Sequence, residues 1–291
     1  MTHTLYIGNR LYFSWSLAVW LMVDRFGLSD HVRTTVLYPE TEDGVGALMT
    51  GLAPARTLPT LVTQDGAILS DSMAIAEELA TRFPDAGLWP QDAVARGTAR
   101  TLANELHSSF RALRGSWPVN LHRSYQRVTP PADVAAECAR LETIWTHARA
   151  VTGSQGPWLC GDYSIADAIF APMAVRLANY GFDTAPTTRA YVAAHLADDS
   201  LRRWRAMGLA AGKVSMVFEQ DAPTRPWPGP MPHAATATDT GTPENAICPY
   251  SGDPVTHLMQ MDGRTFGFCN AFCRDKTVAD PTAWPTFMTL L

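Results

Sequence analysis

The dipeptide Leu58-Pro59, followed twelve residues later by Asp71-Ser72, constrains the fold of the first third of the chain more than any other feature. Hydrophobic periodicity around it predicts alternating strands and helices. The predicted order is strand 5–8, helix 15–26, strand 33–38, short helix 43–49, strands 60–63 and 67–70, and helix 72–82. An X-Pro bond entering the third strand of such a unit is a candidate for the cis form, which proteins largely confine to proline.

These four residues predict a site for a small acidic peptide. A kink at Leu58-Pro59 would turn the N–H and C=O of Leu58 out of the sheet, where an extended peptide can pair with them. Ser72 would lie at the start of a helix, whose free N–H groups and dipole favour a carboxylate. Backbone pairing beside a carboxylate site is what such a peptide needs.

The run Thr57-Leu58-Pro59-Thr60-Leu61, with Asp71-Ser72-Met73-Ala74-Ile75, resembles the glutathione-binding half of glutathione S-transferases. The opening Tyr6-Ile7-Gly8-Asn9 and Ser14-Trp15-Ser16-Leu17 are similar to a bacterial branch near the zeta class. The resemblance implies a thioredoxin-like α/β domain over residues 1–83. In such a domain the residue before the cis proline grips the cysteinyl part of glutathione, and the acidic-Ser pair holds the γ-glutamyl carboxylate.

The same resemblance places Arg56 near the glycyl carboxylate, with a solvated surface arginine as the alternative. A thioredoxin-like module with another role also stays open, because a cis proline alone is typical of that whole fold.

Residues 92–213 are predicted to form a second, all-α domain. Pro, Gly and Asp residues after Phe83 indicate a hinge, and the chain beyond it has helical periodicity without a convincing strand. Ser164 and Asp167 form a capping box, worth about 1 kcal/mol at the start of a helix. A similar box opens a buried helix in the all-α domain of glutathione S-transferases, so the resemblance extends over roughly residues 4–212.

Ser14 is the candidate catalytic residue. A free thiol titrates near pH 8.5, so a hydroxyl donor and a helix N-terminus beside the sulfur would favour the thiolate. Zeta-like relatives use a Ser-Ser-x-Ser run, which here reads Phe13-Ser14-Trp15-Ser16. The resemblance leaves Ser14 as the best donor, with Tyr12, Asn9 and Ser16 as substitutes. Alternatively, Ser14 or Ser16 caps the helix and backbone amides orient the sulfur.

Tyr12, His107 and Arg111 are the candidate residues of a second-substrate pocket. His107, Arg111 and Arg114 have the spacing of one helical face, and the stretch through Pro118-Val119-Asn120 resembles the lining of that pocket. A cationic face there would suit an anionic electrophile. A salt-bridge face between domains or between two chains is the alternative.

The end of the chain predicts a linker over residues 219–245 and a small metal-binding module over residues 246–291. The linker is rich first in proline and then in threonine, which predicts a stiff part followed by a loose part.

Cys248, Cys269 and Cys273 follow with the spacing C-x20-C-x3-C. Two cysteines four apart at the entry to a helix can direct both sulfurs at one ion. A segment this short buries little core, so a metal would supply stability.

The cysteine spacing resembles the TRASH and YHS group of small treble-clef-like metal modules, which implies a zinc site. In four-thiolate relatives a second cysteine follows the first by three residues, a position that Ser251 occupies here. His257 is the preferred fourth ligand, with Asp253, Asp275, a water or an outside thiol as alternatives. A closed site would be structural, whereas an open one would admit heavy-metal capture or sensing. Three unligated cysteines in a packed module are the remaining alternative.

Composition narrows the class of protein further. The net charge of −5 argues against nucleic acid or an anionic membrane surface as a partner. The sequence has neither a signal-peptide pattern nor an apolar run of about eighteen residues, and five cysteines argue against a disulfide framework. These features favour the cytoplasm. Cys138 and Cys160 are predicted to be core residues.

The resemblance implies a glutathione transferase, active as a homodimer, in which the glutathione thiolate attacks a small-molecule electrophile. Phe13 makes glutathione binding a firmer expectation than turnover. A non-catalytic sensor or interaction protein that responds to glutathione or metal is the first alternative. A glutathione-dependent cis–trans isomerase of the maleylacetoacetate type is the second. The zeta class places an arginine for the substrate carboxylate where a rough alignment puts Asn179, with Arg176 one turn earlier.

Overall fold

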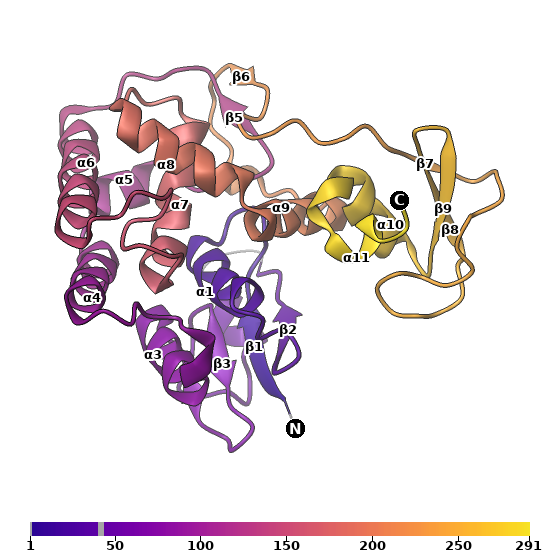
Figure 1. The fold of residues 1–291 in the computed structure, drawn as a ribbon, viewed down its shortest axis with the longest axis horizontal. Coiled ribbons are helices and arrows are strands. Elements are labelled where there is room, and N and C mark those ends of the chain that lie inside the picture. The colour runs from indigo at the N-terminus through magenta and orange to yellow at the C-terminus, as the bar shows by residue number, and fades with distance from the viewer. Residues whose placement is uncertain (1, 40–43) are drawn as a thin grey trace.

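The N-terminal part of the chain is a four-stranded mixed sheet with strand order β2-β1-β3-β4 (Figure 1). The computed structural model describes residues 2–39 and 44–291, so the expected start of a helix at Asp43 lies outside the described residues. The elements are β1 (His3–Ile7), α1 (Ser14–Arg25), β2 (Val32–Val36), α2 (Gly44–Leu48), β3 (Thr60–Val62), β4 (Ile68–Leu69) and α3 (Ser72–Arg82). Strand β1 runs parallel to β2 and antiparallel to β3. The predicted thioredoxin-like order is confirmed, and the Leu58-Pro59 bond is cis as expected.

Side-chain burial explains this arrangement. Leu5 and Ile7 alternate with more exposed neighbours along β1 and are fully buried, as expected for a strand with one face on the core. Helix α1 is buried continuously from Ser16 to Val23 because it packs against both α3 and the central helix of the second domain. Each large apolar side chain removed from water in this way contributes about 1.5 to 3 kcal/mol.

Six α-helices follow a short 3-10 turn at Pro84–Ala86. They are α4 (Ala93–Ser108), α5 (Arg111–Ser116), α6 (Ala132–Thr152), α7 (Ile165–Asn179), α8 (Pro186–Ala197) and α9 (Asp199–Ala211). Helix α7 is buried along its whole length and packs against α1, α4 and α8. Its predicted capping box is present: the N–H of Ser164 donates to Oδ2 of Asp167 at 3.0 Å. None of the described helices is long and apolar enough to cross a membrane.

The expectation that this region contains no strand is wrong at one place. Strand β5 (Ser124–Tyr125) pairs antiparallel with strand β6 (Thr224–Arg225). Strand β6 lies in the segment predicted to be a linker. The next part of that segment forms β7 (Thr236–Thr238), which pairs with a strand of the tail. The supposedly loose, threonine-rich stretch is therefore ordered where its backbone completes a sheet edge, a contact that local composition does not reveal.

The tail is a β-hairpin followed by a helix, as expected for a treble-clef-like module. Strands β7, β8 (His257–Met261) and β9 (Arg264–Phe268) form an antiparallel sheet, followed by α10 (Ala271–Ala279), a 3-10 turn η3 (Pro281–Ala283) and α11 (Pro285–Met288). Phe266, Phe268 and Phe287 are fully buried between the hairpin and the helices. Figure 1 shows the tail at one end of the molecule, next to α9.

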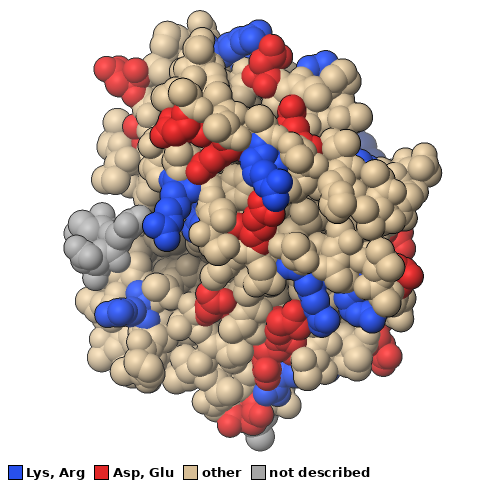
Figure 2. Space-filling view, turned by 90° about the vertical axis from the view of Figure 1, so that its left-hand side faces the viewer, with Lys and Arg blue, Asp and Glu red and all other residues tan. Residues whose placement is uncertain are grey.

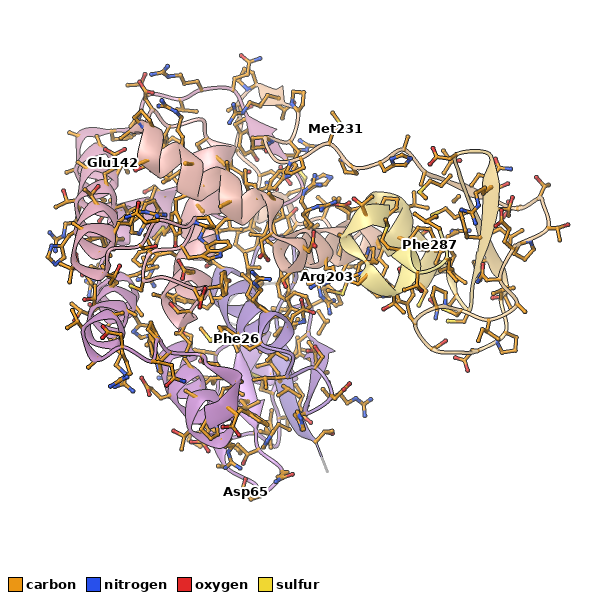
Figure 3. The ribbon with its side chains drawn as sticks, viewed as in Figure 1. Phe26, Asp65, Glu142, Arg203, Met231 and Phe287 are labelled. Atoms are coloured by element: carbon orange, nitrogen blue, oxygen red, sulfur yellow. The ribbon has the colours of Figure 1, made fainter. Side chains whose placement is uncertain are left out.

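Arginines of α9 hold the tail to the body. Arg202 makes a two-pronged contact with Asp280, at 2.7 Å to Oδ1 and 3.0 Å to Oδ2. Arg203 donates to the carbonyl oxygen of Ala283 at 2.9 Å and to Oδ2 of Asp24 in α1 at 2.6 Å. Figure 3 shows Arg203 at the junction between the helical domain and the tail. The tail is thus docked on the body rather than merely tethered to it.

Charge on the face that carries α4 and α6 is mixed. Figure 2 shows acidic and basic side chains interspersed there, and Arg140 of α6 pairs with Glu105 of α4 at 2.7 Å.

Candidate active site

A cleft of about 450 Å³ lies where the first two domains meet. The N-terminal domain contributes the start of α1 and the loop before β3, and the helical domain contributes α5, α7 and the loop after α5. The lining residues are Tyr12, Phe13, Ser14, Trp15, Val45, Arg56, Thr57, Leu58, Arg114, Pro118, Val119, Arg176 and Phe218. Four sequence-predicted site residues are therefore brought together: Tyr12, Ser14, Arg56 and Leu58.

Ser14 is the first residue of α1 and borders the cleft. Its hydroxyl makes no hydrogen bond within the described part of the chain, and α1 has no side-chain cap. Ser16, in contrast, is fully buried, and its Oγ accepts a hydrogen bond from the N–H of Gly8 at 3.1 Å. The capping alternative does not hold for either serine. Ser14 offers a hydroxyl beside a helix N-terminus, while Ser16 is structural.

Phe13 packs its ring against the backbone of Gly8. A Cβ at Gly8 would lie 2.2 Å from this ring, so only glycine leaves room for it. The position at which the zeta-like pattern has its first serine is thus filled by an aromatic side chain that also lines the cleft.

Leu58 borders the cleft. Within residues 2–39 and 44–291, neither its N–H nor its C=O has a hydrogen-bond partner. Thr57 steadies the loop, because its hydroxyl donates to the carbonyl of Ser70 at 2.8 Å and its carbonyl accepts from the hydroxyl of Thr60 at 2.7 Å. Arg56 is exposed at the edge of the cleft. These backbone groups remain available for an extended ligand.

Asp71 and Ser72 lie at the start of α3, outside the walls of the cleft. Asp71 caps the helix, with Oδ1 accepting from Met73 and Ala74, and its Oδ2 lies 2.9 Å from Nε2 of His107. Ser72 is the first residue of α3 and is buried. His107 therefore joins the two domains through Asp71 instead of lining the cleft.

The predicted shared face of His107, Arg111 and Arg114 is wrong. Phe110 adopts a left-handed backbone with φ 59°, which ends α4 and starts α5 in a new direction. Arg111 is exposed and lies outside the cleft. Arg114 lines the cleft, donates to three carbonyl oxygens at the end of α4, and lies 4.7 Å from the centre of the Trp15 ring. Spacing alone could not reveal this break, because no glycine or proline marks it.

Arg176 is a third arginine of the cleft, after Arg56 and Arg114. It is 5% exposed, and it donates to the carbonyl oxygens of Trp117 and Pro172 without an ion pair in the described residues. Burial lowers its pKa to about 10. Asn179 is buried against Asn120 and Ser124 instead. The side chain that faces the cleft is thus the arginine one turn before the position given by the rough alignment.

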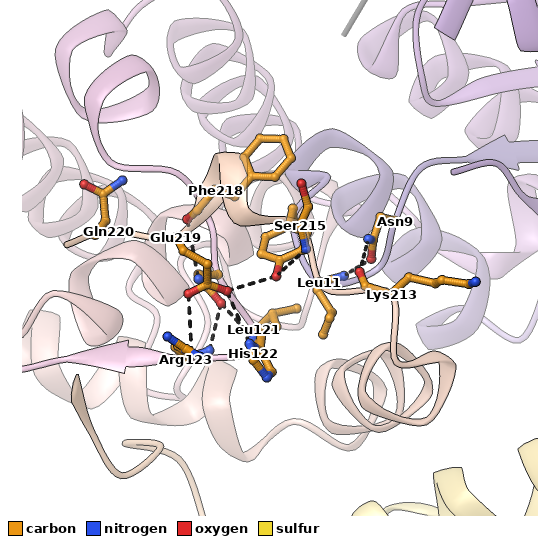
Figure 4. A network of polar contacts seen from close by, with 12 residues as sticks. Asn9, Leu11, Leu121, His122, Arg123, Lys213, Ser215, Phe218, Glu219 and Gln220 are labelled. Carbon is orange, nitrogen blue, oxygen red and sulfur yellow. Dashed lines mark hydrogen bonds and ion pairs between the residues drawn. The ribbon is translucent and has the colours of Figure 1, made fainter. Parts of the chain in front are cut away.

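Residues 213–220, which follow α9 and which we call the strap, were not predicted to belong to the site. Its Glu219 side chain is 4% exposed and accepts from the hydroxyls of Tyr12 and Tyr125, both at 3.1 Å, with His122 at 3.2 Å (Figure 4). Burial by itself raises the pKa of Glu219, but these hydrogen bonds outweigh it and leave the pKa lowered. Burial raises the pKa of Tyr12 to about 12.

Phe218 extends from the strap to the cleft. Its ring stacks on Tyr12 with centroids 4.9 Å apart and meets the ring of Phe13 edge-on at 6.3 Å. The one sequence signal that could have indicated this role is the apolar run before Glu219, at the point where the linker was expected to begin.

The three tail cysteines form a group suited to a metal ion. The sulfur atoms of Cys248, Cys269 and Cys273 all lie within 4.8 Å of one another. The hydroxyl of Ser251 donates to the sulfur of Cys269 at 3.3 Å. His257 is not in the group; it opens β8 opposite Phe268, and its Nδ1 contacts the hydroxyl of Thr256 at 2.9 Å. The hydroxyl oxygen of Ser251 lies beside these sulfurs, and His257 stays a prediction as the fourth ligand.

A buried ammonium lies next to this group. Lys276, one turn after Cys273, is 9% exposed and lies 3.6 Å from the ring centre of Tyr250 and 4.1 Å from that of Trp284. No acidic side chain in the described residues pairs with it. Such a positive charge favours sulfur in its thiolate form, the form that binds metal.

Cys138 and Cys160 are buried in the helical domain, as predicted. Burial raises the pKa of Cys138 to about 11 and that of Cys160 to about 12, which describes unreactive core thiols.

Parts of this chain are similar to known proteins. Residues 13–82 match the family model of the glutathione S-transferase N-terminal domain. A stringent starvation protein A homolog from Pasteurella multocida (strain Pm70) is 31% identical over 170 residues, which cover 57% of this chain and 74% of that protein. A second such homolog, from Coxiella burnetii (strain RSA 493), is 30% identical over 136 residues, covering 46% and 60%.

Solved structures share the fold of the first two domains. A glutathione transferase homolog from Burkholderia GL BGR1, described with bound glutathione, has a TM-score of 0.53 at 24% identity and covers 72% of this chain and 99% of its own. A glutathione transferase from Methylococcus capsulatus has a TM-score of 0.53 at 22% identity, covering 71% and 98%.

Proposed function

The chain belongs to the glutathione S-transferase family, and we propose that it binds glutathione in the interdomain cleft and activates its thiolate for attack on a small electrophile. One observation carries this proposal. Leu58, whose backbone has no hydrogen-bond partner among the described residues, and Ser14, whose hydroxyl likewise has none there, border the same cleft at the start of a helix. The Burkholderia relative, described with bound glutathione, supports the choice of ligand.

Each group of the site has a proposed role. The N–H and C=O of Leu58, beside Pro59, pair with the cysteinyl part of glutathione. The start of α3 at Asp71 and Ser72 takes the γ-glutamyl carboxylate, because helix N-terminal amides favour an anion. Arg56 takes the glycyl carboxylate. The Asp71 side chain already caps α3 and contacts His107, so its contribution is to fix the helix start.

The first chemical step, formation of the glutathione thiolate, takes place beside Ser14. Its hydroxyl donates to the glutathione sulfur and stabilises the thiolate, while the thiol proton leaves to solvent. The thiolate then forms the S–C bond with the electrophile, and the electron pair leaves with the departing group or moves onto an acceptor atom of the electrophile. Phe13 and Tyr12 form part of the apolar wall that keeps water from the sulfur.

An anionic electrophile is favoured by a specific observation. Arg114 and Arg176 line the cleft without an ion pair in the described residues, and Arg176 is almost fully buried. An unpaired buried cation is costly, so an anionic substrate would offset that cost. This observation also keeps cis–trans isomerisation of a maleyl-type acid as a second candidate function, in which the thiolate adds and leaves again.

We further propose that the tail binds one zinc ion through Cys248, Cys269 and Cys273. Three thiolates suit zinc, and a metal would supply the stability that a small module lacks. Ser251 leaves the fourth position to a weak oxygen ligand, and Lys276 partly neutralises the negative site. A role of this site in sensing is the corresponding non-enzymatic candidate. We also propose, from the family relationship, that the protein is a homodimer.

The test is a conjugation assay. Purified protein is given glutathione with a panel of neutral and anionic electrophiles, including a maleyl acid, and Ser14→Ala is measured beside the wild type. The proposal expects turnover that the variant reduces about tenfold to a hundredfold. Glutathione binding without turnover of any electrophile would favour the sensor instead.

A further inference from the structure

We infer that the strap, residues 213–220, is a wall of the electrophile site and that Phe218 makes this site selective for planar, conjugated electrophiles. This inference rests on the proposed glutathione-dependent function. It concerns a segment that begins after the last helix of the second domain and leads toward the tail.

Both domains hold the strap in place. From the N-terminal domain, Asn9 donates through Nδ2 to the carbonyl of Lys213 at 2.6 Å, and the hydroxyl of Tyr12 accepts from the N–H of Ser215 at 3.2 Å. From the helical domain, the hydroxyl of Tyr125 accepts from the N–H of Gln220 at 3.0 Å. The strap is therefore held at its start by the N-terminal domain and at its end by the helical domain.

The turn between these ends directs one ring inward. In η2 (Met216–Phe218), the side chains of Met216 and Val217 are 73% and 78% exposed, whereas Phe218 is half-buried and lines the cleft. Glu219, the next residue, is the anchor of this turn, because its buried carboxylate accepts from Tyr12 and Tyr125. A buried carboxylate with several donors holds its backbone closely.

The ring of Phe218 lines the same cleft as Ser14, the residue proposed to contact the sulfur. The Tyr12 ring stacks on one face of the Phe218 ring, with an interplanar angle of 18°. The Phe13 ring makes an edge contact with it, with an interplanar angle of 67°. The remaining face or edge borders the same cleft as Ser14 and Leu58. Aromatic side chains favour planar π systems over alkyl groups of similar size. The affinity for a ligand with a planar π group should therefore exceed the affinity for an alkyl counterpart by about two- to tenfold.

A conjugated electrophile also fits the charges of the cleft. When a thiolate adds to such an acceptor, the S–C bond forms at an sp² carbon and the π electron pair moves onto the conjugated oxygen or nitro group. That anion then takes a proton from water, or it expels a leaving group. Arg114 and Arg176 line the cleft and supply positive charge where this negative charge develops.

Binding of two glutathione conjugates tests the inference without requiring turnover. Calorimetry compares S-(2,4-dinitrophenyl)glutathione, which carries a planar group, with S-methylglutathione. The wild type should bind the planar conjugate about two- to tenfold more tightly. Phe218→Leu should remove that advantage and leave S-methylglutathione affinity nearly unchanged, while Phe218→Tyr should keep it. Phe26→Leu, at a half-buried phenylalanine outside the cleft, is the matched control.

Each outcome decides the inference. An advantage for the planar conjugate that survives in Phe218→Leu overturns it, whereas its selective loss supports it. If the wild type binds neither conjugate, the proposed function itself fails, and the inference fails with it. If S-methylglutathione binds and the planar conjugate has no advantage, the proposed function stands and the inference alone is overturned.

Glu219 is the positioning residue in this account. Glu219→Gln should reduce the ratio of the two affinities while S-methylglutathione binding stays within about twofold, because only the placement of Phe218 changes. Equal weakening of both conjugates would instead show a general structural role.

Discussion

The phenol oxygen of Tyr12 lies 3.1 Å from Oε1 of Glu219, although the two residues are 207 positions apart in the chain. Tyr12 precedes the first helix of the thioredoxin-like domain, and Glu219 follows the last helix of the all-α domain. This contact makes the start of the linker a structural part of the interdomain cleft. The strap and the cleft are thus joined by a direct contact.

Glu219 is expected to stabilise the fold in a pH-dependent way. Glu219→Gln should lower the free energy of unfolding by about 1 to 3 kcal/mol at neutral pH, because the carboxylate accepts several buried hydrogen bonds. The pKa of Glu219 is lowered in the fold. Its contribution is therefore present above the unfolded value of 4.5 and is lost as the pH falls through the folded value.

Urea unfolding of both proteins at a series of pH values measures this difference. The difference in free energy of unfolding between wild type and variant, here called the gap, should be constant above about pH 5 and shrink below it. Glu77→Gln, which changes an exposed carboxylate on α3, is the control and should show a small gap throughout. A gap for Glu219→Gln that widens toward acid pH would contradict the account.

Ser14→Ala is expected to weaken thiolate formation more than glutathione binding. A hydrogen bond to a charged group is worth about 1.5 to 3 kcal/mol, so the thiolate fraction of bound glutathione at neutral pH should fall about tenfold or more. Ultraviolet absorbance of the thiolate in a pH titration measures this fraction. Ser14→Thr keeps a hydroxyl and should restore part of it. An unchanged titration in Ser14→Ala would remove the assigned role.

Ser251→Cys is expected to tighten zinc binding by the tail. The hydroxyl of Ser251 already lies 3.3 Å from the sulfur of Cys269, so a thiol there completes a four-thiolate site. Competition with a chromophoric chelator should show at least about a tenfold gain in affinity. Thr286→Cys adds a thiol at an exposed place elsewhere in the tail and should leave the affinity unchanged. Equal affinities for wild type and Ser251→Cys would argue against a site at these sulfurs.

Asp280→Asn is expected to loosen the tail from α9. Asp280 is the partner of Arg202 in a mostly buried ion pair, with side chains 9% and 16% exposed. Removing one partner of a buried pair costs about 3 to 5 kcal/mol, so chemical unfolding of the tail should separate from that of the body. Proteolysis of the linker, monitored over time, should accelerate as well. Asp262→Asn, at an exposed ion pair of the tail, is the control; identical proteolysis of both variants would refute the docking role.

The fold was predictable wherever local chemistry determines local structure. The periodicity before and after Leu58-Pro59, the capping box at Ser164 and the spacing of the tail cysteines each depend on residues near one another in the chain. Their predicted consequences agree with the structure: the thioredoxin-like sheet, the start of α7 and the sulfur cluster.

The features that sequence missed depend on contacts between distant segments. Phe110 breaks the helix that spacing predicted, because Arg114 can then satisfy the carbonyl end of α4. Strand β7 is ordered by pairing with β8 and by packing against α10. In the sequence, Glu219 has the character of the first residue of a polar linker. Its role depends on the hydroxyls of Tyr12 and Tyr125, which come from distant segments and donate to its carboxylate. A fourth metal ligand could not be chosen from composition, because the side chains that lie near the sulfurs depend on the folded tail.

Calorimetric titration of glutathione tests the central claim most directly. The wild type is compared with Ser72→Ala, at the proposed carboxylate site, and with Ser108→Ala, at an exposed serine ending α4. The account predicts binding by the wild type and Ser108→Ala that Ser72→Ala weakens about tenfold or more. Absence of glutathione binding by the wild type would contradict it and leave the tail metal site as the place to look for function.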